Sequence, residues 1–376
     1  MRYRPVLAAL LVTIAAALAG AQASLAQGRH GKAHRNVVFV QTNETSGNRI
    51  VVFDRGGDGR LSQAGVYPTG GVGGVATPGT ESDHLASQGS LVYDPGHRVL
   101  LAVNAGSDTV SAFRVRGDRL RLVDVEGSGG QFPASIAVHD GLVYVLNSGG
   151  TGIVQGFRLG RHGLTSIASS ARSLGLANTD PPNFLTSPGQ VGFTPDGSKL
   201  LVTTKASGSA IDVFAVRSDG RLSATPVVNP SATPVPFSFT FSPAGRLVAG
   251  EAGASSVTTY AIQAAGTLTD PKSQSDGQVA LCWIERVRGF YFVSNTGSNT
   301  LSAFQVDASG QPSLLSAVAA TTNPGPIDLA SSDEFLYAQT GTNGTVDEFH
   351  VASDGTLEPL GTVAGLPSGM EGIAAT

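Results

Sequence analysis

The chain has 376 residues, of which 41% are hydrophobic and only 14% are charged, and its formal net charge is -4. This composition supplies enough apolar side chains for a large core and excludes a disordered acidic or basic chain. The absence of a Lys and Arg surplus argues against non-specific nucleic-acid binding. Glycine is frequent, with 49 residues, which favours many tight turns between short strands.

The first 26 residues have the pattern of a secretory signal peptide. Two Arg residues precede Val6–Ala19, an unbroken run of apolar residues and one Thr, and small residues follow it. The alternative, an uncleaved membrane anchor, fits less well because a spanning helix needs roughly 18 or more apolar residues. We therefore predict a signal peptide over 1–26, an exposed linker over 27–36, and no membrane span after cleavage. The mature protein is expected to be secreted, or periplasmic if the host has an outer membrane.

From residue 37 onwards one pattern recurs seven times. An apolar strand ends in small polar residues, a second strand ends on an aromatic residue, and a Gly turn leads to a third strand. The aromatic residues are Phe53, Phe113, Phe157, Phe214, Tyr260, Phe304 and Phe349. One more strand precedes each unit except the first, as in 190–194 before the turn at 195–197. A period near 45 residues with four strands per unit is typical of β-propeller blades.

The two ends of this repeat region complement each other. The first copy lacks the leading strand, whereas Gly369–Ala374 resembles such a strand with nothing after it. We therefore expect the last segment to complete the first blade, which closes the ring and removes exposed sheet edges. The sequence predicts an all-β fold over 37–376: a seven-bladed β-propeller of four-stranded blades.

Two spacings between the aromatic residues, 60 and 57, exceed the period, and the extra residues lie at 71–89 and 171–189. Both insertions precede the leading strand (strand A) of a blade. Antiparallel order puts these connections on the same face as those between the second and third strands (B and C). Long loops on one face are where repeat proteins bind ligands. A neutral surface loop is the alternative.

Ionisable residues on this inserted-loop face are candidates for a site. His84 lies in the first insertion, Lys205 follows a strand B, and Glu251 ends a strand B. Asp328 begins a strand A, so that Glu251 and Asp328 are both expected near the central channel. Other polar residues begin strands A and are expected to form a polar ring at the channel mouth; they are Ser90, Ser135, Gln190, Ser238 and Cys282. Alternatively, they satisfy strand ends and bridging waters. His97, His139 and His162 are expected in tight turns of the opposite face and are discounted.

Cys282 is the only cysteine, so no internal disulfide can form. It lies in an apolar run, which favours a buried and inert thiol. No zinc-binding motif is present, and we expect no metal or other cofactor.

Several segments carry a family resemblance: Phe193–Val202 with its Pro-Asp-Gly turn, Leu142–Asn147, Val293–Phe304, and the Gly-x-Leu motif at 59, 220 and 355. They resemble the lactonase family of seven-bladed propellers, which includes 6-phosphogluconolactonase-type enzymes and the fungal 3-carboxymuconate cyclase and overlaps the YVTN-type repeats. The resemblance covers roughly residues 36–376. The His that family members often carry is replaced by Gln190 and the Arg by Thr296, whereas Glu251 matches the family's glutamate.

The resemblance implies a hydrolase of a small lactone or a related cyclic acid. Such a reaction needs a base to activate water and donors for the oxyanion. Glu251 or His84 is the expected base, and Lys205, Gln190 or backbone amides are the expected donors. The remaining substrate-binding candidates are Asp328, Ser90, Ser135 and Cys282. Two alternatives stay open: a non-catalytic extracellular propeller that binds a ligand or protein on the inserted-loop face, and a cycloisomerase-like enzyme. In each case we expect a monomer.

Overall fold

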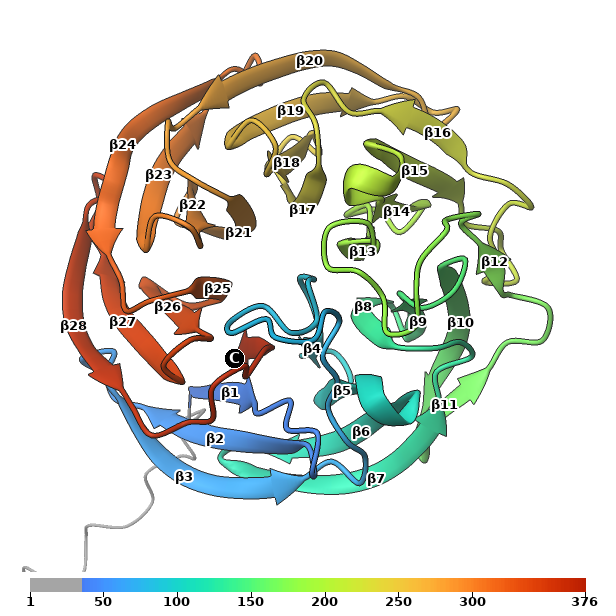
Figure 1. Cartoon of the computed structure of the whole chain (residues 1–376), viewed down its shortest axis with the longest axis horizontal. Coiled ribbons are helices and arrows are strands. Elements are labelled where there is room, and N and C mark those ends of the chain that lie inside the picture. The colour runs from blue at the N-terminus through green and yellow to red at the C-terminus, as the bar shows by residue number, and fades with distance from the viewer. Residues whose placement is uncertain (1–35) are drawn as a thin grey trace, which may run out of the picture. The chain divides into compact units, whose positions relative to one another are not determined.

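Short apolar strands, separated by Gly-containing turns, form seven antiparallel sheets in residues 36–376, the part of the chain that the structure describes. The structure is a computed structural model. The sheets are arranged as blades around a central channel, which confirms the predicted propeller (Figure 1). Six blades have four strands and the third has five. The predicted signal peptide and all but the last residue of the predicted linker lie outside the described residues.

The strands of each blade run from the channel outwards in chain order, except in the first blade. The blades are β29 (Ile373–Ala375), β1 (Val37–Gln41), β2 (Arg49–Arg55) and β3 (Leu61–Pro68); β4 (Leu91–Asp94), β5 (Val99–Asn104), β6 (Thr109–Arg116) and β7 (Arg119–Gly127); β8 (Pro133–His139), β9 (Leu142–Asn147), β10 (Ile153–Gly160), β11 (Gly163–Ser166) and β12 (Arg172–Ser173); β13 (Gln190–Phe193), β14 (Lys199–Thr203), β15 (Ala210–Ala215) and β16 (Val227–Pro230); β17 (Pro236–Phe241), β18 (Leu247–Glu251), β19 (Ser256–Ile262) and β20 (Leu268–Ser275); β21 (Leu281–Val287), β22 (Phe290–Asn295), β23 (Thr300–Val306) and β24 (Pro312–Thr321); and β25 (Pro326–Ser332), β26 (Phe335–Thr340), β27 (Thr345–Val351) and β28 (Leu357–Val363). Two short 3-10 helices, η1 (Ala105–Ser107) and η2 (Lys205–Ser207), follow β5 and β14.

The last strand closes the ring, as the sequence predicts. β29 pairs antiparallel with β1, with Val38 opposite Ala375 and Val40 opposite Ile373. The regular strand begins at Ile373 rather than at Gly369. The preceding residues instead approach one of the inserted loops, described below.

The repeated aromatic residues explain how the blades pack. Within the described residues, seven buried apolar clusters each join two neighbouring blades, and each aromatic residue lies in the cluster between its own blade and the preceding one. Phe113, for example, contributes to the cluster between the first and second blades. The inner strands are covered on both faces, as in β5, which is buried along its length. The outermost strands are alternately covered and exposed, which accounts for their polar sequences.

The Gly-x-Leu turns dock each blade on the preceding one. The Gly59 carbonyl accepts a hydrogen bond from the Tyr337 hydroxyl at 2.8 Å, and the Gly220 carbonyl accepts one from the Tyr144 hydroxyl at 2.9 Å. Gly59 has a positive φ of 83°, which favours glycine. A Cβ atom at this position would also lie 2.2 Å from the ring of Phe335. The motif therefore requires glycine for two reasons, its backbone conformation and this close contact.

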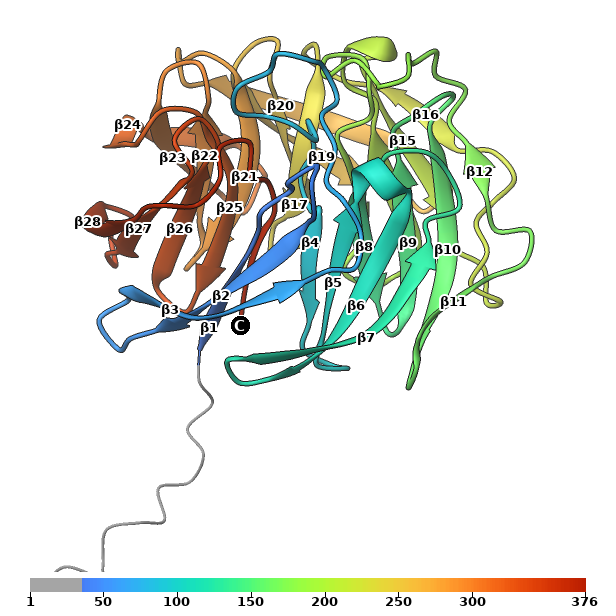
Figure 2. The same cartoon turned by 60° about the horizontal axis from the view of Figure 1, so that its bottom comes forward.

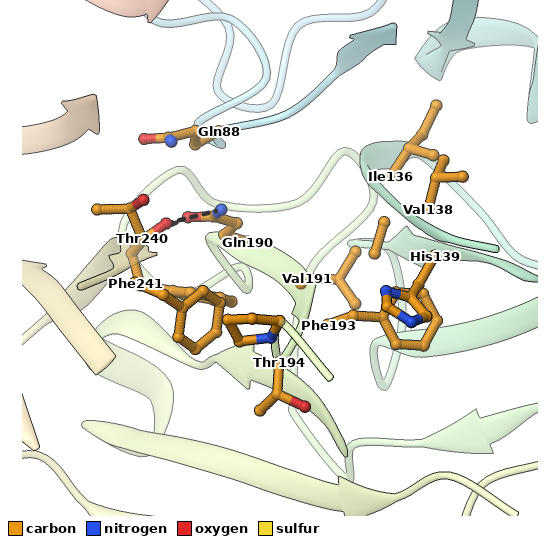
Figure 3. A pocket seen from close by; sticks show the side chains of 14 residues that line it. Gln88, Ile136, Val138, His139, Gln190, Val191, Phe193, Thr194, Thr240 and Phe241 are labelled. Carbon is orange, nitrogen blue, oxygen red and sulfur yellow. Dashed lines mark hydrogen bonds between the residues drawn. The ribbon is translucent and has the colours of Figure 1, made fainter. Parts of the chain in front are cut away.

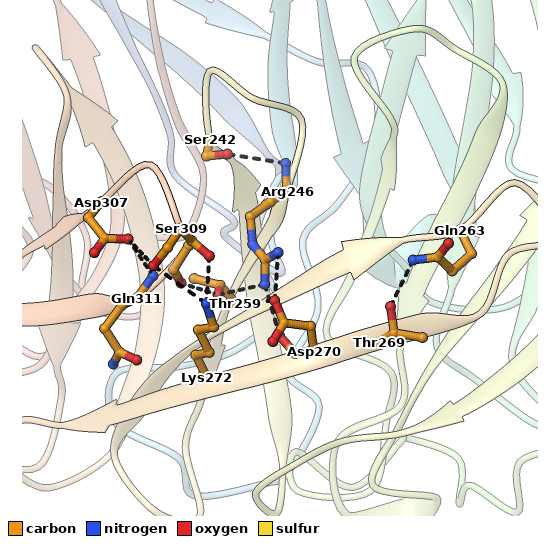
Figure 4. Close-up of polar contacts among 11 residues, drawn as sticks. Ser242, Arg246, Thr259, Gln263, Thr269, Asp270, Lys272, Asp307, Ser309 and Gln311 are labelled. Atoms are coloured by element: carbon orange, nitrogen blue, oxygen red, sulfur yellow. Dashed lines mark hydrogen bonds and ion pairs between the residues drawn. The ribbon is translucent and has the colours of Figure 1, made fainter.

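The contact between the fifth and sixth blades shows the same docking with polar side chains (Figure 4). Thr259 donates a hydrogen bond to the Gly310 carbonyl, and the Lys272 ammonium donates one to the Ser309 carbonyl at 2.6 Å. Arg246 reaches across its own blade to the carboxylate of Asp270, at 3.1 Å. The turn between the third and fourth strands therefore acts as the linking element of the ring.

Candidate functional site

Both predicted insertions are long connections to an innermost strand. The first joins β3 to β4 and the second joins β12 to β13. Figure 2 shows the first loop, in light blue, rising beyond the strands at one end of the ring. The two loops meet, because the backbone N–H of Phe184 donates a hydrogen bond to the Thr77 hydroxyl at 2.9 Å.

Residues 82–88 of the first loop cross the central channel, and we call them the channel plug (Figure 1). They contact innermost elements on several sides. The Trp283 indole donates to the Ser87 carbonyl at 2.9 Å, and the Ser87 hydroxyl donates to the Ala134 carbonyl at 2.7 Å. Glu371, next to the closing strand, accepts a hydrogen bond from the Ser87 backbone N–H at 3.2 Å. The chain itself therefore covers the channel on the inserted-loop face.

A buried lysine fixes the plug. Lys205 is 1% exposed, and its ammonium donates hydrogen bonds to the carbonyls of Ala86 and Phe184, at 2.6 and 2.5 Å. It also donates to the Ser187 hydroxyl at 3.1 Å and lies 4.9 Å from the centre of the Phe237 ring. Lys205 thus ties both inserted loops to the fourth blade, so that its donor capacity is occupied by the protein.

Two carboxyl groups accompany this cation. Burial raises the pKa of Asp83 to about 6, although the charge of Lys205 opposes the shift. Burial, and then the charge of Asp83, raises the pKa of Glu371 well above its usual value. Burial lowers the pKa of Lys205 to about 8.

Two further acids lie on innermost strands. Burial raises the pKa of Asp328, which is 2% exposed, to about 8, so this carboxyl is protonated at neutral pH. Burial raises the pKa of Glu285 to about 7, and its carboxylate accepts a hydrogen bond from the Ser331 hydroxyl at 2.6 Å. Glu285 is only partly covered, and its pKa suits a group that exchanges protons near neutral pH.

Cys282 is buried and carries a free thiol. Burial, followed by the charge of Asp83, raises the pKa of this thiol, so that it is not a reactive thiolate. Across residues 36–376, no three His, Cys, Asp or Glu side chains are grouped in a way that could hold a metal ion.

The predicted polar ring joins neighbouring blades at their inner edges. The Gln190 carboxamide donates to the Phe239 carbonyl at 3.1 Å and accepts from the Phe239 N–H at 2.6 Å. The Ser135 hydroxyl accepts from a backbone N–H of β13, and the Ser238 hydroxyl donates to the Cys282 carbonyl. Backbone groups at the inner edge of a sheet have no strand partner, and these side chains satisfy them.

His84 and Ser90 have different surroundings. His84 is half-buried in the plug, with Nε2 at 2.9 Å from the Thr80 carbonyl oxygen, and burial lowers its pKa. Gly369 packs against its imidazole ring. Ser90 is buried beside the closing segment, and its hydroxyl has no hydrogen-bond partner among the described residues.

The expectation that Glu251 lies beside the central channel is wrong. It does end β18, but its side chain is fully buried and points outward. Its carboxylate accepts hydrogen bonds from four hydroxyl groups, which come from Ser231, Thr233, Thr258 and Tyr260. These partners belong to strand β19 and to the connection that follows β16, and none lies on an innermost strand. The end of β18 lies at the inserted-loop face, where we expected a site. The pairing register, however, directs this carboxylate into the interface between the fourth and fifth blades.

The structure contains a cavity of about 420 Å³ on the channel side of β8, β13 and β17 (Figure 3). Its wall combines apolar side chains, among them Val138, Phe193 and Phe241, with polar groups, which contribute the larger share of the exposed lining. Figure 3 shows Gln88 and Gln190 toward one side and His139 toward the other. The lining positions on the three strands lie toward the turns between first and second strands, so the cavity extends from the plug toward the face opposite the inserted loops.

Sequence reasoning missed the residues that this cavity brings together. The sequence pattern does not predict the position of Gln88, because this residue lies in an irregular loop that enters the channel. His139 is discounted from sequence as a turn residue, although it ends the innermost strand β8 and lines the cavity. Glu285 lies outside the cavity lining and was missed as well, although an acid in an apolar innermost strand is a usable signal because it needs an explanation. Of the predicted residues, only Gln190 lines the cavity.

Comparisons with known proteins agree with the fold. No protein-family model matches the sequence, and no curated protein matches it. A crystal structure of a Lactobacillus plantarum protein is similar, with 19% identity, a TM-score of 0.71, and coverage of 91% of this chain and 99% of the other. The periplasmic gluconolactonase of Pseudomonas aeruginosa has 18% identity and a TM-score of 0.68 over 91% of this chain and 98% of its own.

A Bacteroides fragilis protein, provisionally assigned as a 6-phosphogluconolactonase, has 16% identity and a TM-score of 0.69 over 93% of this chain and 100% of its own. These likenesses support the seven-bladed fold that the repeats and the resemblance predict. In the described part of the chain, no helix is long and apolar enough to cross a membrane.

Proposed function

We propose that this protein hydrolyses a small, uncharged lactone that binds in the channel cavity. The observation that carries the proposal is the wall of that cavity, which combines apolar side chains with two carboxamides, Gln88 and Gln190, and holds a histidine. Fixed polar groups that converge beside apolar side chains in a concave site are typical of small-molecule sites. The fold it shares with a gluconolactonase supports a cyclic ester as the ligand class.

The cavity favours an uncharged substrate. Among the described residues that line it, none is Lys or Arg, so a phosphate would find no cation there. The nearby acids Glu285 and Asp328 would add repulsion to any anion whenever they are ionised. We therefore expect this protein to act on an uncharged lactone, unlike an enzyme that hydrolyses phosphorylated lactones.

We propose two described side chains as the base that lactone hydrolysis needs: His139, which lines the cavity, and Glu285, which does not line it but adjoins a residue bonded to Gln88. His139 lines the cavity, with Nε2 at 3.5 Å from the Asp140 carboxylate. Glu285 follows Ile284 on β21, whose backbone is bonded to Gln88, and its pKa of about 7 suits a general base. His84 and Glu251 are not lining residues of this cavity.

The test is proton release by the purified protein from δ-valerolactone, δ-gluconolactone and the phosphorylated form of δ-gluconolactone, with and without a chelator. We expect release from the uncharged lactones, little from the phosphorylated one, and no effect of chelator. His139→Gln and Glu285→Gln identify the base by a loss of kcat, with exposed His162→Gln as the matched control. Absence of release from every lactone, or a preference for the phosphorylated one, overturns the proposal.

A cycloisomerase would use the same cavity but yield a rearranged product without net addition of water. Product analysis by mass separates the two reactions, because hydrolysis adds one water to the substrate. We propose the hydrolase because one of the fold neighbours with a stated activity is a gluconolactonase.

One observation favours a second candidate, a propeller that binds a partner on the inserted-loop face. Phe184 and Leu185, in the second inserted loop, are 43% and 44% exposed. Exposed apolar side chains on a loop that the fold holds in place are typical of contact surfaces. A Phe184→Ser, Leu185→Ser double variant with unchanged hydrolysis and lost partner binding would support this role.

We also propose that the protein is exported, from the N-terminal pattern of residues 1–26 and the periplasmic location of the Pseudomonas aeruginosa protein. Further, we propose that it acts as a monomer without a cofactor. N-terminal sequencing of protein from the culture medium or periplasm, and its mass in solution, test these points.

A further inference from the structure

Two glutamines in the cavity wall are held in the same way, although they come from different parts of the chain. The Gln88 carboxamide donates to the Ile284 carbonyl and accepts from the Ile284 N–H, both at 3.0 Å. The Gln190 carboxamide makes the same two bonds with Phe239. Each amide thus pairs with the inner edge of the next strand as a neighbouring strand would.

This arrangement uses only half of what each carboxamide offers. A carboxamide has two N–H donors and two acceptor lone pairs, and one of each is engaged in both cases. Gln88 and Gln190 are each partly exposed and both line the cavity. One N–H donor of each remains for a ligand.

The backbone bonds also fix which way each amide points. Because the Ile284 and Phe239 backbones each present one donor and one acceptor, the oxygen and nitrogen of the carboxamide cannot exchange places without losing both bonds. The two glutamines are themselves connected, since the Gln88 backbone N–H donates to the Gly189 carbonyl at 3.0 Å, next to Gln190. Donors held in place before a ligand arrives bind more effectively than mobile ones.

We propose that Gln88 and Gln190 recognise the carbonyl oxygen of an uncharged cyclic ester with their remaining N–H groups. A carbonyl oxygen accepts two hydrogen bonds, and the rest of the ring is left for the apolar wall of Val191 and Phe239. The same donors would stabilise the oxyanion that forms when water attacks the carbonyl carbon. This inference rests on the proposed function, because it names the group of the substrate that is bound.

The recognition places the reacting carbonyl at the plug end of the cavity. It also gives the first inserted loop a role in the site, since the loop delivers Gln88 to the channel wall.

The test uses ligands that the protein cannot hydrolyse, so that it is independent of catalysis. Binding of δ-valerolactam, which keeps the ring carbonyl, and of tetrahydropyran, which lacks it, is measured by ligand-observed NMR titration of the full chain. Gln190→Met and Gln88→Met each remove one amide with little change in side-chain volume. Gln263→Met, on the outside of the fifth blade (Figure 4), is the matched control.

We expect the wild-type protein to bind the lactam more tightly than the ether. Each variant should weaken lactam binding roughly 3- to 10-fold, the effect of one hydrogen bond, and leave ether binding unchanged. The control variant should bind both ligands like the wild type. Equal affinity for the two ligands, absence of lactam binding, or unchanged lactam affinity in both glutamine variants overturns the inference. If Gln190→Met does not fold, as its melting curve would show, Gln88→Met decides alone.

The two proposals fail separately. Weaker lactam binding in the variants without any lactone hydrolysis would support the recognition and overturn the hydrolase. Lactone hydrolysis with unchanged lactam binding in the variants would support the hydrolase and overturn the recognition.

Discussion

The ammonium nitrogen of Lys205 lies 2.6 Å from the carbonyl oxygen of Ala86 and so joins the fourth blade to the loop that covers the channel. A fully buried cation of this kind compensates the charge of the acids around it. It is therefore the residue on which we expect the position of the channel plug to depend.

Replacing Lys205 by Met is predicted to destabilise the protein by about 3 to 5 kcal/mol, the usual effect of removing one partner from a buried charge group. The loss follows because Asp83 and Glu371 would keep their burial without the cation. Urea unfolding measures the change, and limited proteolysis should cut within residues 71–89. Lys199→Met, on the same blade, is the control, with an expected change within about 0.5 kcal/mol. Equal stability and protease resistance of the Lys205 and Lys199 variants would contradict the role given to Lys205.

Gly59→Ala is predicted to lower the free energy of unfolding by about 2 to 4 kcal/mol, from backbone strain and overpacking together. The added methyl group would meet Phe335 at the contact between the last and first blades. Gly245 also has a positive φ, of 77°, but no atom lies within 4 Å of an added Cβ. Gly245→Ala should therefore cost only the strain, about 1 kcal/mol. A similar loss in both variants, measured by chemical denaturation, would show that the docking contact contributes nothing.

The raised pKa values of the channel acids predict a protein that is more stable in mild acid. Asp328 has a pKa of about 8 in the folded protein, and burial also raises the pKa of Asp83 and of Glu285. Between the ordinary carboxyl pKa and these values the folded state binds more protons than the unfolded state, so stability falls as pH rises. The melting temperature should decline from pH 5 to pH 8.

Asp328→Asn tests the largest of these contributions, since the amide cannot ionise. The decline in melting temperature from pH 5 to pH 8 should be shallower in this variant than in the wild type. At pH 8 the variant should be the more stable of the two. Parallel melting-temperature curves would mean that Asp328 does not hold its proton in the folded protein.

Glu251→Gln is predicted to change stability rather than activity. The carboxylate accepts four hydroxyl hydrogen bonds inside the protein, and an amide nitrogen cannot accept any of them. We expect a loss of about 1 to 3 kcal/mol in unfolding free energy. The kcat for any lactone that the protein hydrolyses should be unchanged. A large fall in kcat with unaltered stability would return Glu251 to the position of catalytic base.

The fold was predictable because each blade repeats the same physical solution. The aromatic end of a third strand, such as Phe113, must pack between blades, and the Gly-x-Leu turn must dock on the preceding blade. The site was less predictable. Residue Glu251 could be placed at a strand end, but the direction of its side chain depends on the pairing register. Gln88 could not be placed at all, because no periodic pattern determines how an irregular loop crosses a channel.

Pairing of β29 with β1 has a consequence for the order of events during synthesis. The backbone N–H of Val37 donates a hydrogen bond to the hydroxyl of Thr376, across 339 positions of sequence. Until this distant segment leaves the ribosome, the first blade lacks its innermost strand and the plug lacks Glu371. Such long-range pairing is slow to form, so an export machinery that accepts only unfolded chains would have time to engage this one. If the protein is exported as we propose, the ring and its covered channel would be completed together after translocation.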